Sequence, residues 1–584
     1  MANIIVYLVF AAAIAIPSCK ANNSATFAFL ERWHGGFKAQ VKVTVSGNYN
    51  GWTLSLSFDE PVYSVQNWVA DLTSVWSNFY GFEFRSNTPV WPGYVIDMII
   101  IGDAGQSGVQ PKEIGVKFNE VVILNGGQFG GSIGIPVATT TPTVTIDNNN
   151  NGKYNYVEAL EKSILFYEAQ RSGKLPPDNR VPWRGDSALG DGSDVGKDLT
   201  GGWYDAGDTV KFNFPMAWST TTLIWGLLQY RDAYKSSGQY NWMLKSVRWP
   251  LEYFVKCHVS DNELYGQVGN GHTDHASWIP AEGMTMNRPS YKIHAGAPGS
   301  DLAGETAAAM AAGYLVFRDE DPAFAATLLD HAKRLYAFAD GYRGYYSQSI
   351  PDAQSFYGST DYTDELCWAA AWLYLATNDA GYLAKAQSFY DSAVPWAFSW
   401  ADKQPGYMVL LAQITGDDKY KQDVAGFLNS WSRTGGGVTY TPKGLAWRDA
   451  WGSLRYSGNA AFIALMAADL GVDPSKSRDF ARSQIHYALG DTGRSYVVGY
   501  GYNPPQRCHH KGASCPQWHS CGWNYYNSGS ANVHTIYGAL VGGPDKYDGY
   551  SDDRTKYEHT EVACDYNAGY QGALAGLIAL ANGK

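Results

Sequence analysis

A stretch rich in Thr and Asn, GIPVATTTPTVTIDNNNNGK at residues 134–153, separates two parts of the chain with different hydrophobic patterns. Before it, apolar residues alternate with polar ones, as in GWTLSLSF, and Gly, Asn and Pro separate the runs. After it, apolar residues recur at helical spacing, as in YNYVEALEKSILFYEAQ, DELCWAAAWLYLA and SGNAAFIALMAADLG. A chain of 584 residues is also too long for one core. The sequence therefore predicts a small antiparallel β-sandwich at residues 22–135, a linker at 136–152 and a mostly α-helical domain at 153–584.

The first 21 residues have the pattern of a secretory signal. An uncharged apolar run from Ile4 to Ile16 is followed by small and polar residues, and cleavage is expected near Ala21. The apolar run is short for a membrane span. We therefore expect a secreted, extracellular protein without a membrane partner.

The charge of the chain argues against nucleic acid as a partner. The formal net charge is -11, the pI is about 5.6, and no run of clustered Lys and Arg is present. Phosphate backbones are bound by such clusters. We expect a neutral ligand and a monomeric protein.

Six cysteines follow the signal, and an oxidising compartment favours disulfides between them. Three of them lie in CHHKGASCPQWHSC, at residues 508–521, where interleaved histidines also suggest a zinc site. The spacing matches no standard zinc-ligand pattern. A disulfide between Cys515 and Cys521 is the interpretation that we favour for this segment.

Two aspartates, Asp205 and Asp208, lie three residues apart in GGWYDAGDTVKFNFPMAWS. Such a pair on its own indicates a turn, because Asp tolerates turn geometry beside Gly. A possible partner is Glu561, which precedes VACDYNAG and a final apolar helix. Hydrolysis of an acetal bond to a sugar needs one carboxyl group to protonate the leaving oxygen and one carboxylate to activate water or attack. Asp208 and Glu561 are therefore candidates for such a pair.

Long segments after the linker resemble glycoside hydrolase family 9, the endoglucanases of cellulose degradation. The resemblance runs in order and without large gaps from Lys153 to Lys584. Besides the first helical segment, it is carried by WRGDSALGDGSDVGKDLTGGWYDAGDTVKFNFPMA, DELCWAAAWLY, WGSLRYSGNAAFIAL, GYGYNPPQRCHH and DDRTKYEHTEVACDYNAGYQGALAGL.

The resemblance implies an (α/α)6 barrel with an open cleft and an inverting mechanism. It implies that Asp208 is the general base, that Asp205 helps to hold the attacking water, and that Glu561 is the general acid. We expect burial or a nearby carboxylate to raise the pKa of Glu561, and hydrogen bonds to keep Asp208 ionised. Inversion needs room for water, so we predict a separation of roughly 6.5–9.5 Å between these two carboxyl groups.

His509 matches the substrate-binding histidine in the Pro-His-His-Arg motif of that family. The sequence departs from the motif twice, with Cys508 in place of Pro and Lys511 in place of Arg. Lys lacks the planar fork of Arg, which leaves a substrate-binding role for Lys511 in doubt. A disulfide between Cys508 and Cys564 is a further hypothesis, because it would join two active-site loops.

The resemblance also implies further cleft residues, and aromatic platforms suit the flat apolar faces of a glucan chain. The implied cleft residues are His275, Trp400, Trp451, Arg455, Tyr456 and Tyr566. No cofactor is implied for catalysis, but some members of the family carry structural calcium. The matching positions for calcium are Asp364 and Glu365, to which the nearby Asp402 could add a ligand.

The segment before the linker resembles a family 2 carbohydrate-binding module, a β-sandwich that docks on crystalline polysaccharide through a strip of tryptophans. Trp33, Trp68 and Trp91 match that strip and lie beside Gly, Asn or Pro. Trp52 lies inside an alternating apolar strand and is predicted to be core. The alternative is that all four tryptophans belong to the core.

The sequence thus predicts a secreted endo-β-1,4-glucanase that binds cellulose through its first domain and hydrolyses internal linkages with its second. Two alternatives stay open. One is a hydrolase of a related β-glucan or xylan, because discrimination between sugars depends on loop geometry. The other is a glycan-binding protein that has lost its catalytic activity.

Overall fold

The chain divides into two compact units, Met1–Thr143 and Val144–Lys584. The division falls inside the stretch rich in Thr and Asn. The residues of the predicted signal and of the predicted linker at 136–152 lie outside those that the structure describes. The computed structural model describes residues 153–516 and 521–584, and before them 23–33, 36–46, 48–49, 51–58, 62, 64–66, 71–76, 81–86, 90, 94–103, 111–112, 114–119 and 121–124.

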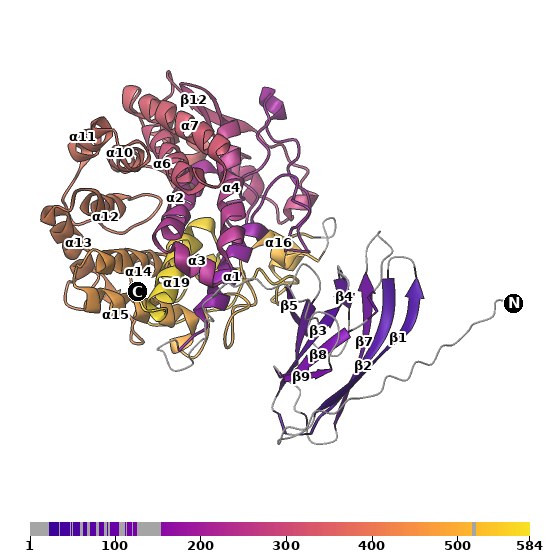
Figure 1. Cartoon of the computed structure of the whole chain (residues 1–584). Helices are drawn as coiled ribbons and strands as arrows, with labels where there is room; N and C mark the ends of the chain where they lie inside the picture. Colours follow the sequence, from indigo (N-terminus) through magenta and orange to yellow (C-terminus); the bar gives the residue numbers. More distant parts are fainter. Residues whose placement is uncertain are drawn as a thin grey trace. The chain divides into compact units, whose positions relative to one another are not determined.

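In its described part, the first unit consists of two antiparallel sheets (Figure 1). One sheet has the strand order β1-β2-β7-β4, and the other has the order β5-β6-β3-β8-β9. The strands of the first sheet are β1 (Ser24–Trp33), β2 (Gly36–Thr44), β7 (Val95–Asp103) and β4 (Ser64–Gln66). Those of the second are β5 (Asp71–Trp76), β6 (Gly81–Ser86), β3 (Trp52–Phe58), β8 (Ile114–Phe118) and β9 (Val121–Leu124).

Alternate residues of both sheets form one hydrophobic core. The predicted alternation is confirmed, since Val41 and Val43 of β2 and Leu54 and Leu56 of β3 are buried. Trp52 is buried as predicted and stacks on an aromatic ring of β8.

The side chains of the three tryptophans predicted to bind polysaccharide lie outside the described residues. Trp33 ends β1, but its side chain lies outside the described residues, as do Trp68 and Trp91 entirely. The proposed binding strip stays a prediction.

The second unit is a helical domain built around six mainly buried helices (Figure 1). Each of them contacts the next one in chain order, and the last contacts the first. Their sequences are apolar on all sides, as expected for helices surrounded by protein. They are α2 (Asn213–Gln229), α6 (Ser300–Phe317), α10 (Thr363–Thr377), α12 (Gln404–Thr415), α14 (Ser453–Asp469) and α19 (Cys564–Ala581).

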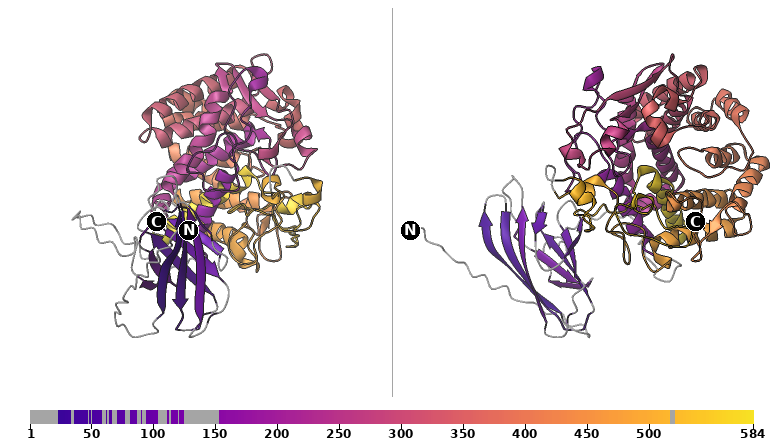
Figure 2. Two further views of the ribbon diagram at one scale, coloured as in Figure 1. Left: turned by 90° about the vertical axis from the view of Figure 1, so that its right-hand side faces the viewer. Right: turned by 180° about the vertical axis from the view of Figure 1, so that it is seen from behind.

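A second set of helices packs against the outside of the first set (Figure 2). These helices are amphipathic or mostly exposed; α13, for example, buries only Tyr420, Val424 and Phe427. They are α1 (Tyr156–Ala169), α4 (Tyr240–Cys257), α7 (Pro322–Gly341), α11 (Ala380–Phe389), α13 (Asp418–Ser430) and α15 (Pro474–His486). The helices predicted from YNYVEALEKSILFYEAQ, DELCWAAAWLYLA and SGNAAFIALMAADLG are confirmed as α1, α10 and α14.

Loops with short helices and strands lead into the first turns of the inner helices. Their residues form the site described below, and the N-terminal ends of the helices favour negative charge there. The short helices in these loops are α5 (Gly271–His275), α8 (Tyr346–Ser349), α9 (Gln354–Tyr357), α16 (Lys511–Ser514), α17 (Trp523–Tyr526) and α18 (Tyr557–Thr560), and a further short helix, α3 (Arg231–Ser236), lies between α2 and α4. The short strands are β10 (Lys211–Phe212), β11 (His258–Ser260), β12 (Glu263–Val268), β13 (Ser290–His294), β14 (Thr439–Tyr440) and β15 (Ala446–Trp447).

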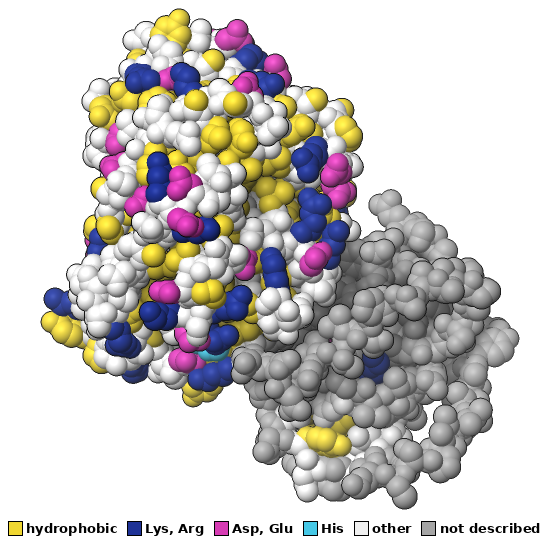
Figure 3. Space-filling view, turned by 60° about the vertical axis from the view of Figure 1, so that its left-hand side comes forward, with side chains coloured by type: hydrophobic (Ala, Val, Ile, Leu, Met, Phe, Trp, Pro, Cys, Tyr) yellow, Lys and Arg dark blue, Asp and Glu magenta, His cyan; other side chains and the backbone are white. Residues whose placement is uncertain are grey.

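On the face of the helical domain shown in Figure 3, Lys and Arg side chains are interspersed with Asp and Glu rather than gathered into a basic patch. This mixture agrees with the expectation that the domain binds a neutral ligand. None of the helices among the described residues has the length and apolarity needed to cross a bilayer.

Candidate active site

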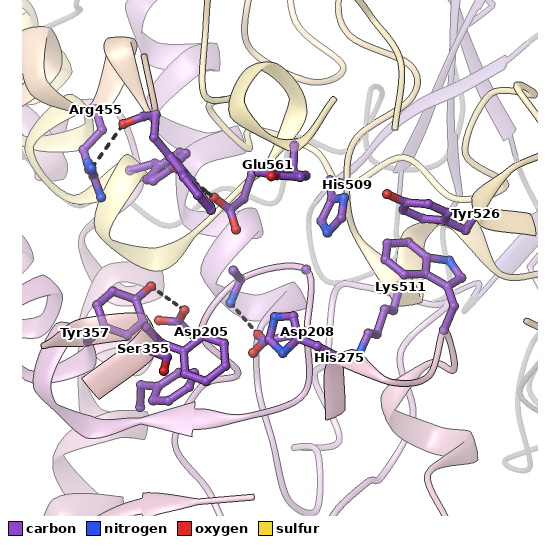
Figure 4. Close-up of a pocket in the computed structure, with 18 of the residues that line it drawn as sticks. Asp205, Asp208, His275, Ser355, Tyr357, Arg455, His509, Lys511, Tyr526 and Glu561 are labelled. Carbon is purple, nitrogen blue, oxygen red and sulfur yellow. Dashed lines mark hydrogen bonds between the residues drawn. The ribbon is translucent and has the colours of Figure 1, made fainter. Parts of the chain in front are cut away.

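A cleft of about 520 Å³ lies among the loops that lead into the inner helices (Figure 4). It brings together most of the residues singled out from the sequence. Those that line it are Asp205, Asp208, His275, Trp400, Trp451, Arg455, His509, Lys511, Glu561 and Tyr566.

Backbone hydrogen bonds join three distant segments of the chain at this cleft. The Lys511 N–H donates to the carbonyl of Gly207 (2.8 Å), the His509 N–H to that of Thr560 (3.0 Å), and the Cys564 N–H to that of Asp205 (2.9 Å). Main-chain contacts therefore fix the loops that carry the two aspartates, the histidine and Glu561.

Gly207 lets the aspartate turn approach the histidine segment closely. A Cβ atom at this position would lie 2.1 Å from the carbonyl oxygen of His509, which no side chain permits. The glycine inside the Asp-Ala-Gly-Asp motif is thus required by packing between two loops.

Asp205 is buried at the base of the cleft, and its two oxygens differ. Oδ2 accepts a hydrogen bond from the hydroxyl of Tyr357, whereas Oδ1 has no hydrogen-bond partner in the described part of the chain. Burial, followed by the neighbouring charge of Asp208, raises the pKa of Asp205 well above its usual range. Asp205 therefore holds a proton more firmly than an exposed aspartate does.

Asp208 lies beside Asp205 and accepts a hydrogen bond from the Ala206 N–H (3.1 Å) (Figure 4). Burial, followed by the charge of Asp274, raises the pKa of Asp208 to about 6, although His275 and Lys511 lower it. Burial thus outweighs the hydrogen bond that was expected to keep this carboxylate ionised, and raises its pKa. Asp208 is ionised at neutral pH but takes up a proton in mild acid.

Glu561 lies across the cleft from the two aspartates (Figure 4). Its Oε2 accepts hydrogen bonds from the indole N–H of Trp451 and the hydroxyl of Tyr566 (2.8 Å). Burial raises the pKa of Glu561 as expected, the charge of Asp565 adds to this, and the two hydrogen bonds oppose it. Because both donors bind Oε2, Oε1 is the oxygen left to carry a proton into the cleft.

His509 is held in one tautomer. Its Nδ1 lies 2.9 Å from the carbonyl oxygen of Arg554, which only accepts, so Nδ1 carries the proton and Nε2 is an acceptor. Burial lowers the pKa of His509 to about 4, so the ring is neutral near neutral pH. A neutral histidine in the cleft can accept a hydrogen bond from a sugar hydroxyl.

Lys511 has a structural partner rather than a free ammonium group. Only 3% of its side chain is exposed, and its Nζ donates to the carboxylate of Asp274 and to the Asp274 carbonyl oxygen (2.8 Å). Asp208, Asp274 and His275 place ligand atoms within 4.8 Å of one another, as in a metal site. The ammonium of Lys511 already provides the positive charge there, so these residues do not fit a further cation.

Arg455 forms a second buried ion pair, with Asp565 (2.7 Å). Its guanidinium also binds the hydroxyl of Tyr456 (2.7 Å) and lies over the ring of Tyr566. Tyr456, which was expected in the cleft, is not one of its lining residues. Its hydroxyl and its ring both contact the guanidinium of Arg455, and it orients that side chain.

Several lining residues carried no signal in the sequence. Tyr357 ends the four-residue helix α9 and belongs to none of the motifs, and single aromatic residues are usually core. Two could have been suspected from their neighbours, since Trp278 lies three residues after His275 and Trp523 follows the cysteine-rich segment. The unpredicted side chains in the cleft are Phe212, Trp278, Ser355, Phe356, Tyr357, Trp523, Tyr526 and Tyr557.

The disulfide between Cys515 and Cys521 is confirmed, which leaves both cysteines unable to bind zinc. The hypothesis of a bridge between Cys508 and Cys564 is wrong, because both are buried free thiols. The Cys564 thiol instead donates to the carbonyl of Tyr204 (3.3 Å). Backbone hydrogen bonds, not a disulfide, join the two active-site loops.

The residues proposed for calcium fit a metal ion only in part. Glu365 forms a buried ion pair with Lys403, so its charge is already matched. Asp364 has one buried oxygen without a hydrogen-bond partner in the described residues, and burial, followed by the charge of Asp364, raises the pKa of Asp402 to about 7. The calcium prediction therefore rests on Asp364 and Asp402.

Comparisons with known proteins agree with the geometry of the helical domain. The family model described as Glycosyl hydrolase family 9 matches residues 156–574. Endoglucanase A of Bacillus pumilus is 48% identical over 453 residues, covering 74% of this chain and 68% of that protein. The solved structure of an endoglucanase from the termite Nasutitermes takasagoensis is 54% identical with a TM-score of 0.72, covering 73% of this chain and 99% of that one. Endoglucanase CelQ from Clostridium thermocellum, complexed with cellotriose, is 41% identical with a TM-score of 0.66, covering 73% of this chain and 70% of that one.

Proposed function

This chain belongs to glycosyl hydrolase family 9 and is a glycoside hydrolase, and from that premise we propose that it hydrolyses internal β-1,4 linkages of cellulose with inversion. The observation that carries the proposal is the arrangement of Asp205 and Asp208 opposite a partly buried Glu561 in an aromatic cleft. The relatives named above are endoglucanases, and one of them was solved with a cello-oligosaccharide.

In the proposed reaction, Asp208 is the general base. A water molecule held by Asp208 and by Oδ1 of Asp205 attacks the anomeric carbon and gives a proton to Asp208. The bond to the glycosidic oxygen breaks as Glu561 gives its proton from Oε1 to that oxygen. Water enters opposite the leaving group, so the configuration inverts. Tyr357 supports this step, because it occupies Oδ2 of Asp205 and leaves Oδ1 for the water.

The physical state of the carboxyl groups supports these roles. Burial raises the pKa of Glu561, which favours the protonated form that an acid needs. The pKa of Asp208 is about 6, so this carboxylate is ionised at neutral pH. The separation of roughly 6.5–9.5 Å between the two groups stays a prediction, which a crystal structure would check.

The test is hydrolysis of soluble carboxymethyl cellulose, followed by loss of viscosity and release of reducing ends. We expect rapid thinning by the wild type and a loss of about 10²–10⁴-fold in rate for Asp208→Asn and for Glu561→Gln. Asp418→Asn is the matched control, because its side chain is 82% exposed on α13. Full activity of either catalytic variant would contradict the assigned roles.

The two alternatives give different results in the same assay. A hydrolase of another β-glucan or of xylan would act faster on mixed-linkage glucan or xylan than on carboxymethyl cellulose. A non-catalytic glycan-binding protein would hydrolyse none of them and still bind solid cellulose. Calcium is not required by the proposed chemistry.

We also propose that the six inner helices close into an (α/α)6 barrel and that the first unit binds cellulose. The ring of contacts between neighbouring helices supports the barrel. For the first unit, we expect Trp33→Ala, Trp68→Ala and Trp91→Ala to reduce adsorption to crystalline cellulose. Trp52→Phe should not, because Trp52 is buried. Secretion stays a prediction from the apolar segment at residues 4–16.

A further inference from the structure

Three aromatic side chains, Trp278, Trp523 and Tyr526, line the cleft together beside His509. Figure 4 shows Tyr526 and His509 at the opposite side of the site from Arg455 and Tyr357. We call the three aromatic residues the aromatic wall. Their rings contact one another, with centroid distances of 4.8 Å for Trp278 and Tyr526, 5.3 Å for Trp523 and Tyr526, and 6.2 Å for Trp278 and Trp523.

The wall has a buried support and an exposed surface. Trp278 is only 3% exposed, and its indole N–H donates to the hydroxyl of Ser514 (2.8 Å) on α16. Trp523 is 45% exposed in the same cleft. An exposed indole backed by a fixed aromatic ring is the arrangement that binds the apolar face of a sugar ring.

The segment that carries Trp523 and Tyr526 does not hold itself in place. It is the four-residue helix α17, none of whose side chains is buried. On one side, the disulfide ties Cys521 to Cys515, which directly follows α16. On the other side, the guanidinium of Arg554 donates to the carbonyl of Tyr525 (2.7 Å).

We propose that the aromatic wall is a subsite for a β-linked glucosyl unit of the substrate chain, and that the Cys515–Cys521 disulfide sets the affinity of this subsite. The inference rests on the proposed function, because the occupant is a unit of the chain that the carboxyl groups cleave. The disulfide keeps Trp523 in its binding position before the sugar arrives, which reduces the ordering cost of binding. The other cysteines in the described residues are buried free thiols, so a mild reductant acts on this disulfide alone.

The experiment measures the affinity of cellohexaose for the full-length Glu561→Gln protein by isothermal titration calorimetry. We expect Trp523→Ala in this background to weaken binding about fivefold, in line with the loss of one aromatic stacking contact. Reduction of the disulfide should weaken binding about threefold when Trp523 is present and cause no further loss in Trp523→Ala. Tyr502→Ala is the control, because Tyr502 is 79% exposed but does not line the cleft.

The coupling between the two changes distinguishes a positioning role from a general loss of structure. An equal loss on reduction with and without Trp523 would overturn the role of the disulfide, and unchanged binding by Trp523→Ala would overturn the subsite. The double variant Cys515→Ser, Cys521→Ser should behave like the reduced protein, and if it does not fold, reduction of the folded protein carries the test. If the oxidised Glu561→Gln protein binds no cello-oligosaccharide at all, the proposed function fails and this inference fails with it.

Discussion

Asp208 and Glu561 lie on opposite sides of one cleft, but different parts of the chain hold them in place. The turn that contains Asp208 is held by main-chain hydrogen bonds and by the close approach of Gly207 to His509. The carboxyl group of Glu561 is held by two side-chain donors, Trp451 and Tyr566.

A buried ion pair accompanies each side as well. Lys511 and Asp274 flank Asp208, and Arg455 and Asp565 flank Glu561. On the Asp208 side, the charges that shift the pKa of Asp208 also join α5 to α16. The pKa and the folding stability therefore depend on the same contacts. On the Glu561 side, the donors can be removed without breaking the main-chain contacts. We therefore expect loss of either buried ion pair to reduce stability, and loss of a donor to Glu561 to affect mainly the pH dependence.

The largest effect is expected for Lys511→Met. This change leaves the carboxylate of Asp274 buried without its counter-charge, which costs about 3–5 kcal/mol of folding free energy. It also removes a charge that lowers the pKa of Asp208, so activity in mild acid should fall. Chemical denaturation measures the first effect. Lys511→Arg keeps the charge and should retain most of the stability, whereas equal stability of the Met and Arg variants would show that the ion pair contributes little.

The next largest effect is expected for Asp565→Asn on the other side of the cleft, which also costs folding free energy because it leaves the buried guanidinium of Arg455 without its counter-charge. The charge of Asp565 raises the pKa of Glu561, so its removal lowers that pKa. The acid must be protonated to act, and the variant should therefore lose activity at lower pH than the wild type. We expect the basic limb of kcat/KM on a soluble cello-oligosaccharide to move down by about one pH unit. A limb that moves upward would contradict the proposed influence of Asp565.

Tyr566→Phe, one residue further along α19, should move the same limb in the opposite direction. The Tyr566 hydroxyl donates to Glu561 and lowers its pKa, so its removal raises that pKa. The variant should keep activity to a pH about half a unit higher than the wild type. Because Tyr566 lines the cleft, kcat/KM is measured across the whole pH range, so that a uniform loss of binding is separated from a shifted limb. The same direction of shift for Asp565→Asn and Tyr566→Phe would disprove this account of Glu561.

The motif residues on both sides of the cleft could be predicted from the sequence. The motif residues Asp205, Asp208, His509 and Glu561 were found because short, specific segments carry them, and the structure brings all four into one cleft. The inner helices were equally accessible, since long apolar segments at helical spacing have few other interpretations.

The sequence could not show which side chains pair around Asp205 and Asp208. Tyr357 contacts Asp205 across 152 positions of the chain, and Lys511 pairs with Asp274 across 237. Such contacts depend on how loops pack, which local patterns do not encode. The wrong hypothesis of a bridge between Cys508 and Cys564 has the same origin. Both residues belong to loops of the site, but their thiols are free and do not bond to each other.

The smallest effect is expected for His275→Asn. A positive charge on His275 lowers the pKa of Asp208, so its removal raises that pKa slightly above about 6. The base must be ionised to act, and the acidic limb of kcat/KM should therefore move to higher pH, by about 0.3 units. The shift is small because the His275 side chain is 46% exposed, where water screens its charge, and because Lys511 remains in place. The pH profile of kcat/KM is measured between about pH 5 and 7. The free energy of unfolding of this variant should equal that of the wild type. A loss of stability as large as that of Lys511→Met would show that His275 also contributes both to the pKa of Asp208 and to the free energy of unfolding.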